Sequence, residues 1–260
     1  MKRTILAGIA AMAFVAGGAS SLWAQKPPAP KSAKELDAVK ALFAASQAGP
    51  DQIIAAAEAL ITGFADTEFK EIALFFEARS YQQKNDLVKA QVYSERVLEI
   101  NPKNFQTTLM LGEIMTQTTR ENDLDKEEKL AKAEKYLKDT MENLKTAAKP
   151  NPQTPDKEWE DAKQQMTAEA HSGLGLAALT RKKFDVAAAE FKTASEVDPQ
   201  PAYLVRQASA LQSLGKNDEA IAICDKLLTD PQLHPQIKQV TQNVRAAAIK
   251  AGGKTPDAKK

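Results

Sequence analysis

The sequence predicts an all-α fold built from repeated antiparallel helix pairs, and three observations support this prediction. Ala78 and Ala90 stand twelve residues apart, and Pro102 follows after another twelve. Similar small residues recur along the chain at intervals close to thirty-four residues. Between them, apolar residues are spaced three or four apart, as on one face of a helix. About five such units fit between Ser32 and Pro231.

The clearest unit occupies residues 70–104. Its first helix should end near Gln83, and Asn85 is predicted to cap the second helix. Pro102 should end that helix, because proline lacks an N–H group and disfavours helix in the preceding residue. This pattern resembles the tetratricopeptide repeat, a helical pair of thirty-four residues. The resemblance implies a right-handed α-α superhelix, a solenoid in which neighbouring pairs stabilise one another by stacking.

Residues 1–24 have the three-part pattern of a secretory signal peptide. Lys2 and Arg3 precede an apolar run, and small residues lead up to Ala24. We expect cleavage after Ala24, with cleavage after Ala19 as the alternative. An uncleaved segment would be long enough to anchor the protein in a membrane. The sequence therefore predicts an exported protein, periplasmic or extracellular, with membrane association only if the segment is not cleaved.

Residues 25–31 form a proline-rich spacer, and the solenoid is predicted to span residues 32–251. Ser32 and Glu35 match a capping box at the start of the first helix. Ala44 and Ala56 occupy the small positions of this first unit, thirty-four residues before those of the clearest unit. The first unit lacks the closing proline.

The third unit departs from the regular period. Gly112 lies thirty-four residues after Ala78, but a charged insertion at residues 120–128 delays the small position of the second helix to Ala133. We expect a solvated loop or a helix extension there, with a partner-specific feature as the alternative. Three prolines in residues 149–155 then form a linker between two repeat blocks or, as we prefer, a loop inside one continuous stack.

Two further units follow, and a helix from about Pro235 to Ala251 is expected to cover the exposed end of the stack. Residues 252–260 are predicted to form a disordered tail. Bulky residues should fill the space beside the small ones, where a larger side chain would cost about 1 to 3 kcal/mol. The predicted repeat-packing positions are Ala44, Ala56, Ala78, Tyr81, Ala90, Pro102, Gly112, Ala133, Gly175, Ala187, Phe191, Pro199, Ala208, Ala220 and Pro231.

Composition and charge exclude several classes of function. The 260 residues are 43% hydrophobic and 27% charged, an ordinary globular composition. Removing Lys2 and Arg3 from the 35 basic residues leaves 33 against 34 acidic residues, a net charge of −1. Such a chain lacks the basic field that nucleic-acid binding needs. With Cys224 as its single cysteine, it has no intrachain disulfide, and we expect neither a metal site nor a cofactor.

In tetratricopeptide-repeat proteins the first helices of the pairs line a concave groove that holds an extended peptide or a partner's helix. The resemblance implies that the stripe next to the packing positions lines this groove, although some members, Val205 among them, could pack against the next repeat instead. The stripe lacks the Lys/Asn pattern with which chaperone-binding relatives hold a terminal carboxylate. The implied groove residues are Phe75, Arg79, Gln82, Leu109, Glu113, Thr116, Ser172, Leu176, Val205, Ser209 and Gln212.

Candidates for catalytic chemistry are few. His171 falls at a helix-packing position, and Glu169 lies two residues away on another face, so we expect a core or boundary histidine instead of a catalytic base. Cys224 falls on a buried stripe, as a small hydrophobe. Trp159 is expected to cover the stack beneath it, with an exposed partner anchor as the alternative. We therefore predict no catalytic residues.

Together these features predict a non-catalytic exported scaffold or adaptor that binds a peptide or a partner's helix, in cell-envelope assembly or secretion. A membrane-anchored protein with the same solenoid is the alternative within this fold. The alternative from another class is an enzyme or small-ligand receptor that uses the groove around Arg79, Glu113 and His171.

Overall fold

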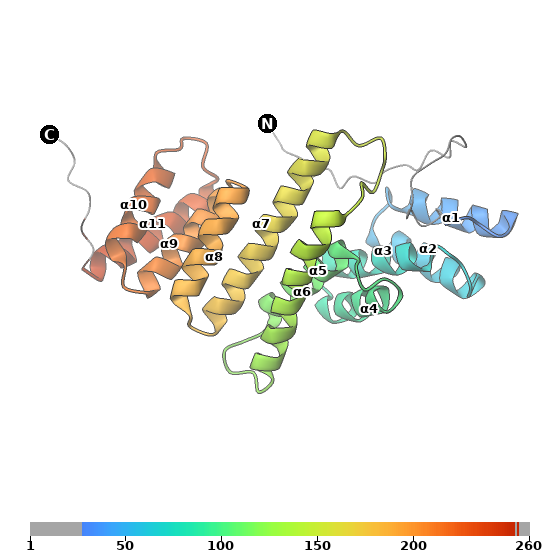
Figure 1. Cartoon of the computed structure of the whole chain (residues 1–260), viewed down its shortest axis with the longest axis horizontal. Coiled ribbons are helices and arrows are strands. Elements are labelled where there is room, and N and C mark those ends of the chain that lie inside the picture. Colours follow the sequence, from blue (N-terminus) through green and yellow to red (C-terminus); the bar gives the residue numbers. More distant parts are fainter. Residues whose placement is uncertain (1–27, 253, 255–260) are drawn as a thin grey trace. The chain divides into compact units, whose positions relative to one another are not determined.

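A computed structural model describes residues 28–252 and residue 254 of the chain (Figure 1). Within this part, the regular secondary structure consists of eleven α-helices, and no strand is present. The prediction of an all-α fold is confirmed. The predicted signal peptide at residues 1–24, residues 25–27 of the spacer and residues 253 and 255–260 of the predicted tail lie outside the described residues.

The chain divides into two compact units. Unit 1 comprises the residues up to Thr107 together with Ala148–Pro155, and unit 2 comprises Thr108–Ala147 and the residues from Asp156 onward. Most helices that follow one another along the chain pack against each other, which gives antiparallel pairs such as α3 with α4 and α7 with α8. The helices of unit 1 are α1 (Ala33–Ala45), α2 (Pro50–Gly63), α3 (Lys70–Gln83), α4 (Leu87–Ile100) and the start of α5 (Phe105–Thr118).

The start of α1 follows the predicted capping box. The Ser32 Oγ accepts a hydrogen bond from the Glu35 N–H at 3.1 Å. The Glu35 carboxylate accepts from the Lys31 N–H at 2.6 Å, one residue earlier than in the standard box. Two backbone donors at the helix start are thereby satisfied.

The connection between α3 and α4 corrects one predicted cap. Asn85 has a φ of +58°, the left-handed conformation in which helices commonly end and which asparagine tolerates. The cap of α4 is Asp86, whose carboxylate accepts a hydrogen bond from the Lys89 N–H at 3.2 Å. Asn85 therefore ends α3, and the next residue starts α4.

The first helix pair differs from the predicted register. Ala44 is exposed and Ala56 is half-buried, whereas Ala57 is fully buried. Six residues connect α2 to α3, against four between α4 and α5. The longer connection shifts the buried face of α2, so that Ala57 stands thirty-seven residues before its buried counterpart Ser94.

In the other pairs the predicted small positions are all buried. Tyr81 stacks on Tyr93, with ring centroids 5.1 Å apart. The Tyr93 ring therefore fills the space that its small neighbour Ser94 leaves open. The three predicted prolines are exposed instead of packed, because they act by ending the preceding helix. These prolines are Pro102 after α4, Pro199 after α8 and Pro231 after α10.

Unit 2 continues α5 from Thr108 and contains six further helices. Leu137 lies against two glycines there: a Cβ added at Gly112 would come within 2.5 Å of the Leu137 side chain, and one at Gly173 within 2.8 Å. Only glycine permits this close approach. The helices are α6 (Lys126–Thr146), α7 (Asp156–Thr180), α8 (Phe184–Val197), α9 (Pro201–Ser213), α10 (Asn217–Leu228) and α11 (Pro235–Lys250).

The two irregular segments take defined positions. The insertion at residues 120–128 forms the connection to α6 and its first turn, where Glu127 accepts a hydrogen bond from the Arg181 side chain at 2.7 Å. Residues 149–155 connect α6 to α7, and these two helices pack directly against each other. The proline-rich segment is therefore a loop that joins two packed helices of unit 2.

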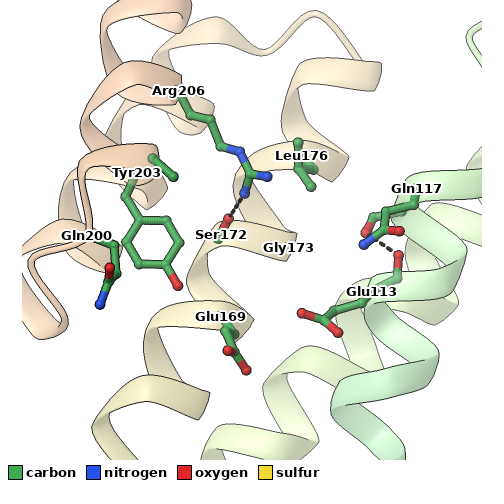
Figure 2. Close-up of a pocket in the computed structure, with 11 residues that line it drawn as sticks. Glu113, Gln117, Glu169, Ser172, Gly173, Leu176, Gln200, Tyr203 and Arg206 are labelled. Atoms are coloured by element: carbon green, nitrogen blue, oxygen red, sulfur yellow. Dashed lines mark hydrogen bonds between the residues drawn. The ribbon is translucent and has the colours of Figure 1, made fainter. Parts of the chain in front are cut away.

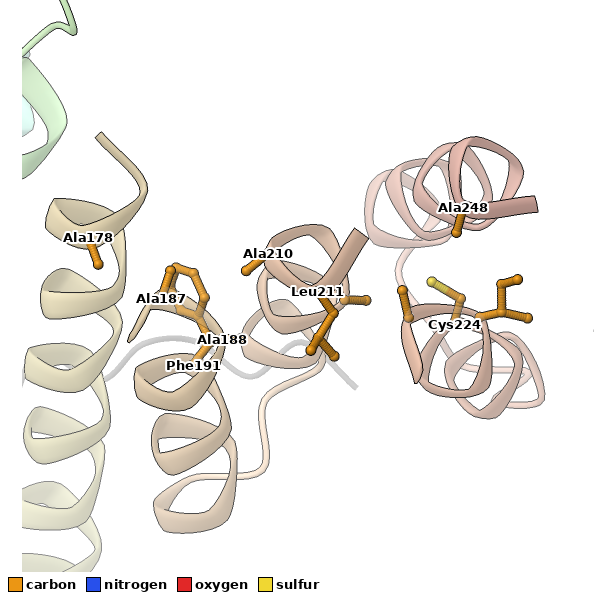
Figure 3. Close-up of a cluster of buried hydrophobic side chains, with 11 residues drawn as sticks. Ala178, Ala187, Ala188, Phe191, Ala210, Leu211, Cys224 and Ala248 are labelled. Atoms are coloured by element: carbon orange, nitrogen blue, oxygen red, sulfur yellow. The ribbon is translucent and has the colours of Figure 1, made fainter. Parts of the chain in front are cut away.

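The last helix closes the core at the C-terminal end of unit 2. Figure 3 shows Ala248 of α11 opposite Cys224 of α10, in a cluster that continues through Leu211 to Phe191. Ala248, Cys224 and Phe191 are all fully buried. α11 thus covers the apolar face that α9 and α10 would otherwise leave open.

Candidate functional site

A cavity of about 290 Å³ opens on unit 2, lined by α5, α7 and the start of α9 (Figure 2). These are the first helices of three successive pairs, and each presents residues spaced three or four apart, which share a helix face. The lining residues with side-chain chemistry are Glu113, Thr116 and Gln117 from α5, Glu169, Ser172 and Leu176 from α7, and Gln200, Tyr203 and Arg206 at α9.

Two carboxyl groups from different helices face this cavity. Burial raises the pKa of Glu113 to about 7, helped by repulsion from Glu169 and opposed by Arg206. Burial also raises the pKa of Glu169, which accepts a hydrogen bond from the Gln165 amide at 2.9 Å. Among the described residues neither carboxylate has a cation in an ion pair. The charge of both groups is therefore only partly compensated.

Arg206 supplies the one guanidinium of the cavity, and its Nη1 donates a hydrogen bond to the Ser172 Oγ. Ser172 is 4% exposed, whereas Arg206 is exposed at the rim. Tyr203 is 8% exposed, and burial raises its pKa to about 12, so that its phenol stays neutral. The cavity thus combines two carboxyl groups, one exposed guanidinium and a neutral aromatic wall.

The structure brings together four of the predicted groove residues. Glu113, Thr116, Ser172 and Leu176 all line the cavity. The Thr116 hydroxyl donates to the Glu113 carbonyl oxygen at 3.0 Å, so it is satisfied within its own helix. Two predicted residues on α5 and two on α7 therefore lie at the cavity.

Other predicted groove residues lie elsewhere. Leu109 is 6% exposed and packs with Leu137 and Leu174, and Val205 is 5% exposed and packs with Leu227 and Leu233. Both are core residues, because a neighbouring helix or connection covers their faces. Ser209 and Gln212 are half-buried on α9, beyond the cavity, which ends at Arg206. Phe75, Arg79 and Gln82 are half-buried on α3 of unit 1, where the Arg79 guanidinium lies 5.9 Å from the Phe75 ring centre.

Sequence reasoning missed Glu169, Tyr203 and Arg206. Glu169 lies one turn before Ser172 on the predicted stripe, so extending the stripe by one turn would have found it. On α9 the predicted stripe began at Val205, whereas the lining face begins at Tyr203 and continues to Arg206. Helical spacing alone does not distinguish these adjacent faces.

The candidates for catalytic chemistry lie outside this cavity. His171 is half-buried, and its Nδ1 lies 2.7 Å from the Glu190 carboxylate of α8, as a boundary histidine held by a neighbouring helix. Cys224 is fully buried, and burial raises its pKa to about 11. Trp159 is 7% exposed, in agreement with its predicted covering role. Among the described residues no group of three or more His, Cys, Asp or Glu is arranged to hold a metal ion.

Comparison with known proteins supports the repeat pattern. Residues 73–104, which cover most of α3 and all of α4, match the family model described as tetratricopeptide repeat. The fold is similar to that of a thermophilic TPR protein from Thermus thermophilus, with a TM-score of 0.52 and 19% sequence identity over 83% of this chain and 99% of that chain. Comparison with curated proteins gives no match. Residues 73–104 are thus similar to a tetratricopeptide repeat, and the fold of the chain is similar to that of a TPR protein.

Proposed function

We propose that the protein is a non-catalytic scaffold that binds an extended peptide or a helix of another protein in the cavity of unit 2. The supporting observation is that α5, α7 and α9, the first helices of three successive pairs, line one concave site. In the tetratricopeptide-repeat proteins that the chain resembles, the first helices of the pairs line the groove that holds partner segments. Exposed amides at Gln117 and Gln200 add hydrogen-bonding groups that a peptide backbone can use.

Capture of partners from an envelope extract tests this function. Ala202 lines the cavity and is half-buried, so Ala202→Trp should fill the space that a partner segment needs. Ser213→Trp is the matched control, because Ser213 is exposed on the same helix and lies outside the cavity. We expect the Ala202→Trp variant to capture at least tenfold less partner protein than the unsubstituted chain. The Ser213→Trp variant should capture as much as the unsubstituted chain. Equal capture by both folded variants would overturn the proposed site.

We further propose that the protein is exported and acts in envelope assembly or secretion. The support is the signal-peptide pattern of residues 1–24. Among the described residues, no helix has both the length and the apolar character needed to cross a bilayer. Cell fractionation with N-terminal sequencing should find a mature terminus at Gln25. An intact N-terminus in the membrane fraction would support the anchored alternative instead.

A further inference from the structure

We propose that the cavity of unit 2 recognises a lysine or arginine side chain of an extended partner segment, which inserts between Glu113 and Glu169. This inference rests on the proposed function and names the chemistry of the partner. Glu113 comes from α5 and Glu169 from α7, and both line the same cavity (Figure 2).

The charges of the cavity favour a cationic ligand. Its ionisable lining groups are Glu113, Glu169, Tyr203 and Arg206, and no lysine is among them. With both carboxylates ionised and the phenol neutral, the site carries one net negative charge. Arg206 is exposed at the rim and already donates to Ser172, so it compensates only part of that charge. A cation bound between the two carboxylates would neutralise the remaining negative charge.

The electrostatics of Glu113 agree with a missing positive charge. Burial is the main cause of its raised pKa of about 7, and the nearby Glu169 raises the pKa further. Arg206 acts in the opposite direction, and Tyr203 faces the same space as a neutral phenol. An ammonium or guanidinium group placed there would stabilise the ionised form.

The size and walls of the cavity suit a single long side chain. The cavity measures about 290 Å³, just below the range of about 300 to 1,000 Å³ for pockets that enclose drug-sized ligands. It is therefore large enough for one lysine or arginine side chain. Leu176 and the Tyr203 ring offer apolar surface against which the methylene groups of lysine or arginine can pack. Two carboxylates without a third ligand are a poor metal site but a good match for an organic cation.

The test uses four immobilised libraries of random heptapeptides that differ only in the central residue: lysine, arginine, glutamine or glutamate. The mature chain, residues 25–260, should bind the lysine and arginine libraries at least tenfold more strongly than the other two. Glu113→Gln combined with Glu169→Gln should remove this preference. Glu128→Gln combined with Glu158→Gln is the control, because both residues are exposed in unit 2 and the loss of charge is the same.

The pH dependence supplies an independent measurement. Since Glu113 must be ionised to hold the cation, binding of the lysine library should increase about tenfold between pH 6 and pH 8. Glu113→Gln should flatten this increase. Circular dichroism of each variant at pH 8 verifies that the chain is folded.

Several outcomes would overturn the inference. Binding that ignores the central residue, yet disappears in Ala202→Trp, would leave the proposed function standing without its cationic specificity. Preference for the glutamate library would assign the recognition to Arg206 instead. Spermidine binding that depends on both carboxylates, without any peptide binding, would indicate a small-amine site. Absence of both peptide binding and protein capture would overturn the proposed function as well.

Discussion

Glu77 is a buried carboxyl group at the centre of unit 1, on α3. The residue is 1% exposed, and its Oε2 and the nearby Ser80 Oγ have no hydrogen-bond partner among the described residues. Burial raises the pKa of Glu77 from 4.5 to about 7, repulsion from Glu58 adds to the rise, and Arg96 opposes it. The folded chain therefore holds the proton more tightly than the unfolded chain. The corresponding stability is fully present below pH 4.5 and is lost as the pH rises through 7.

Glu77→Gln should raise the free energy of unfolding at pH 8 by about 2 kcal/mol. The reason is that the folded chain then no longer has to bury an ionised carboxylate at this position. At pH 4.5 the change should be close to zero, since the glutamate is then protonated in the fold. Urea unfolding at the two pH values measures the difference. Glu99→Gln, an exposed change on α4, should have no pH-dependent effect. An equal effect of Glu77→Gln at both pH values would contradict the assignment.

At the scale of the element, the packing of α6 depends on glycines in its neighbours. Leu137 is fully buried and contacts the Gly112 and Gly173 positions on α5 and α7. Gly112→Ala should lower the free energy of unfolding by about 1 to 3 kcal/mol, because its methyl group would overlap the Leu137 side chain. Urea unfolding measures this loss. Gly63→Ala is the control: no atom lies within 4 Å of its added Cβ, so it should be neutral or slightly stabilising.

A double-mutant cycle checks the cause of this loss. Leu137→Ala alone should cost about 2 to 5 kcal/mol, as for other large-to-small core changes. In that background Gly112→Ala should cost little, because the overlapping atoms are gone. Additive losses would show that the cost of Gly112→Ala arises elsewhere than at the contact with Leu137.

The sequence predicted most elements because helix starts, prolines and small residues are local signals. Pro235 placed the start of α11, and the spacing of Ala78 and Ala90 identified buried faces of α3 and α4. The prediction failed for the first helix pair, because the longer connection after α2 changes the register of its buried face. A prediction that assumes a constant repeat length does not allow for such a change. On α9 the predicted face was displaced from Tyr203 and Arg206, because the choice between adjacent faces depends on which neighbour covers each one.

At the scale of the whole molecule, the last helix of a series of helix pairs must cover the apolar face that would otherwise be exposed at the end. Cys224 is the single cysteine of the chain, is fully buried, and lies in one cluster with Ala248 of α11. Burial also raises its pKa to about 11, which keeps the thiol in its unreactive protonated form. The reactivity of this thiol therefore reports whether α11 covers α10.

In the full chain, Cys224 should react with a thiol reagent at pH 8 at least ~100-fold more slowly than in the denatured chain, since the helices must open first. A chain that ends at His234 lacks α11, and its Cys224 should react at least ~10-fold faster than in the full chain while circular dichroism still reports helix. A chain that ends at Ala251 retains α11 and should keep the full protection. If removal of α11 leaves the folded chain equally protected, α9 and α10 alone enclose the thiol, and α11 is not the cover of this end.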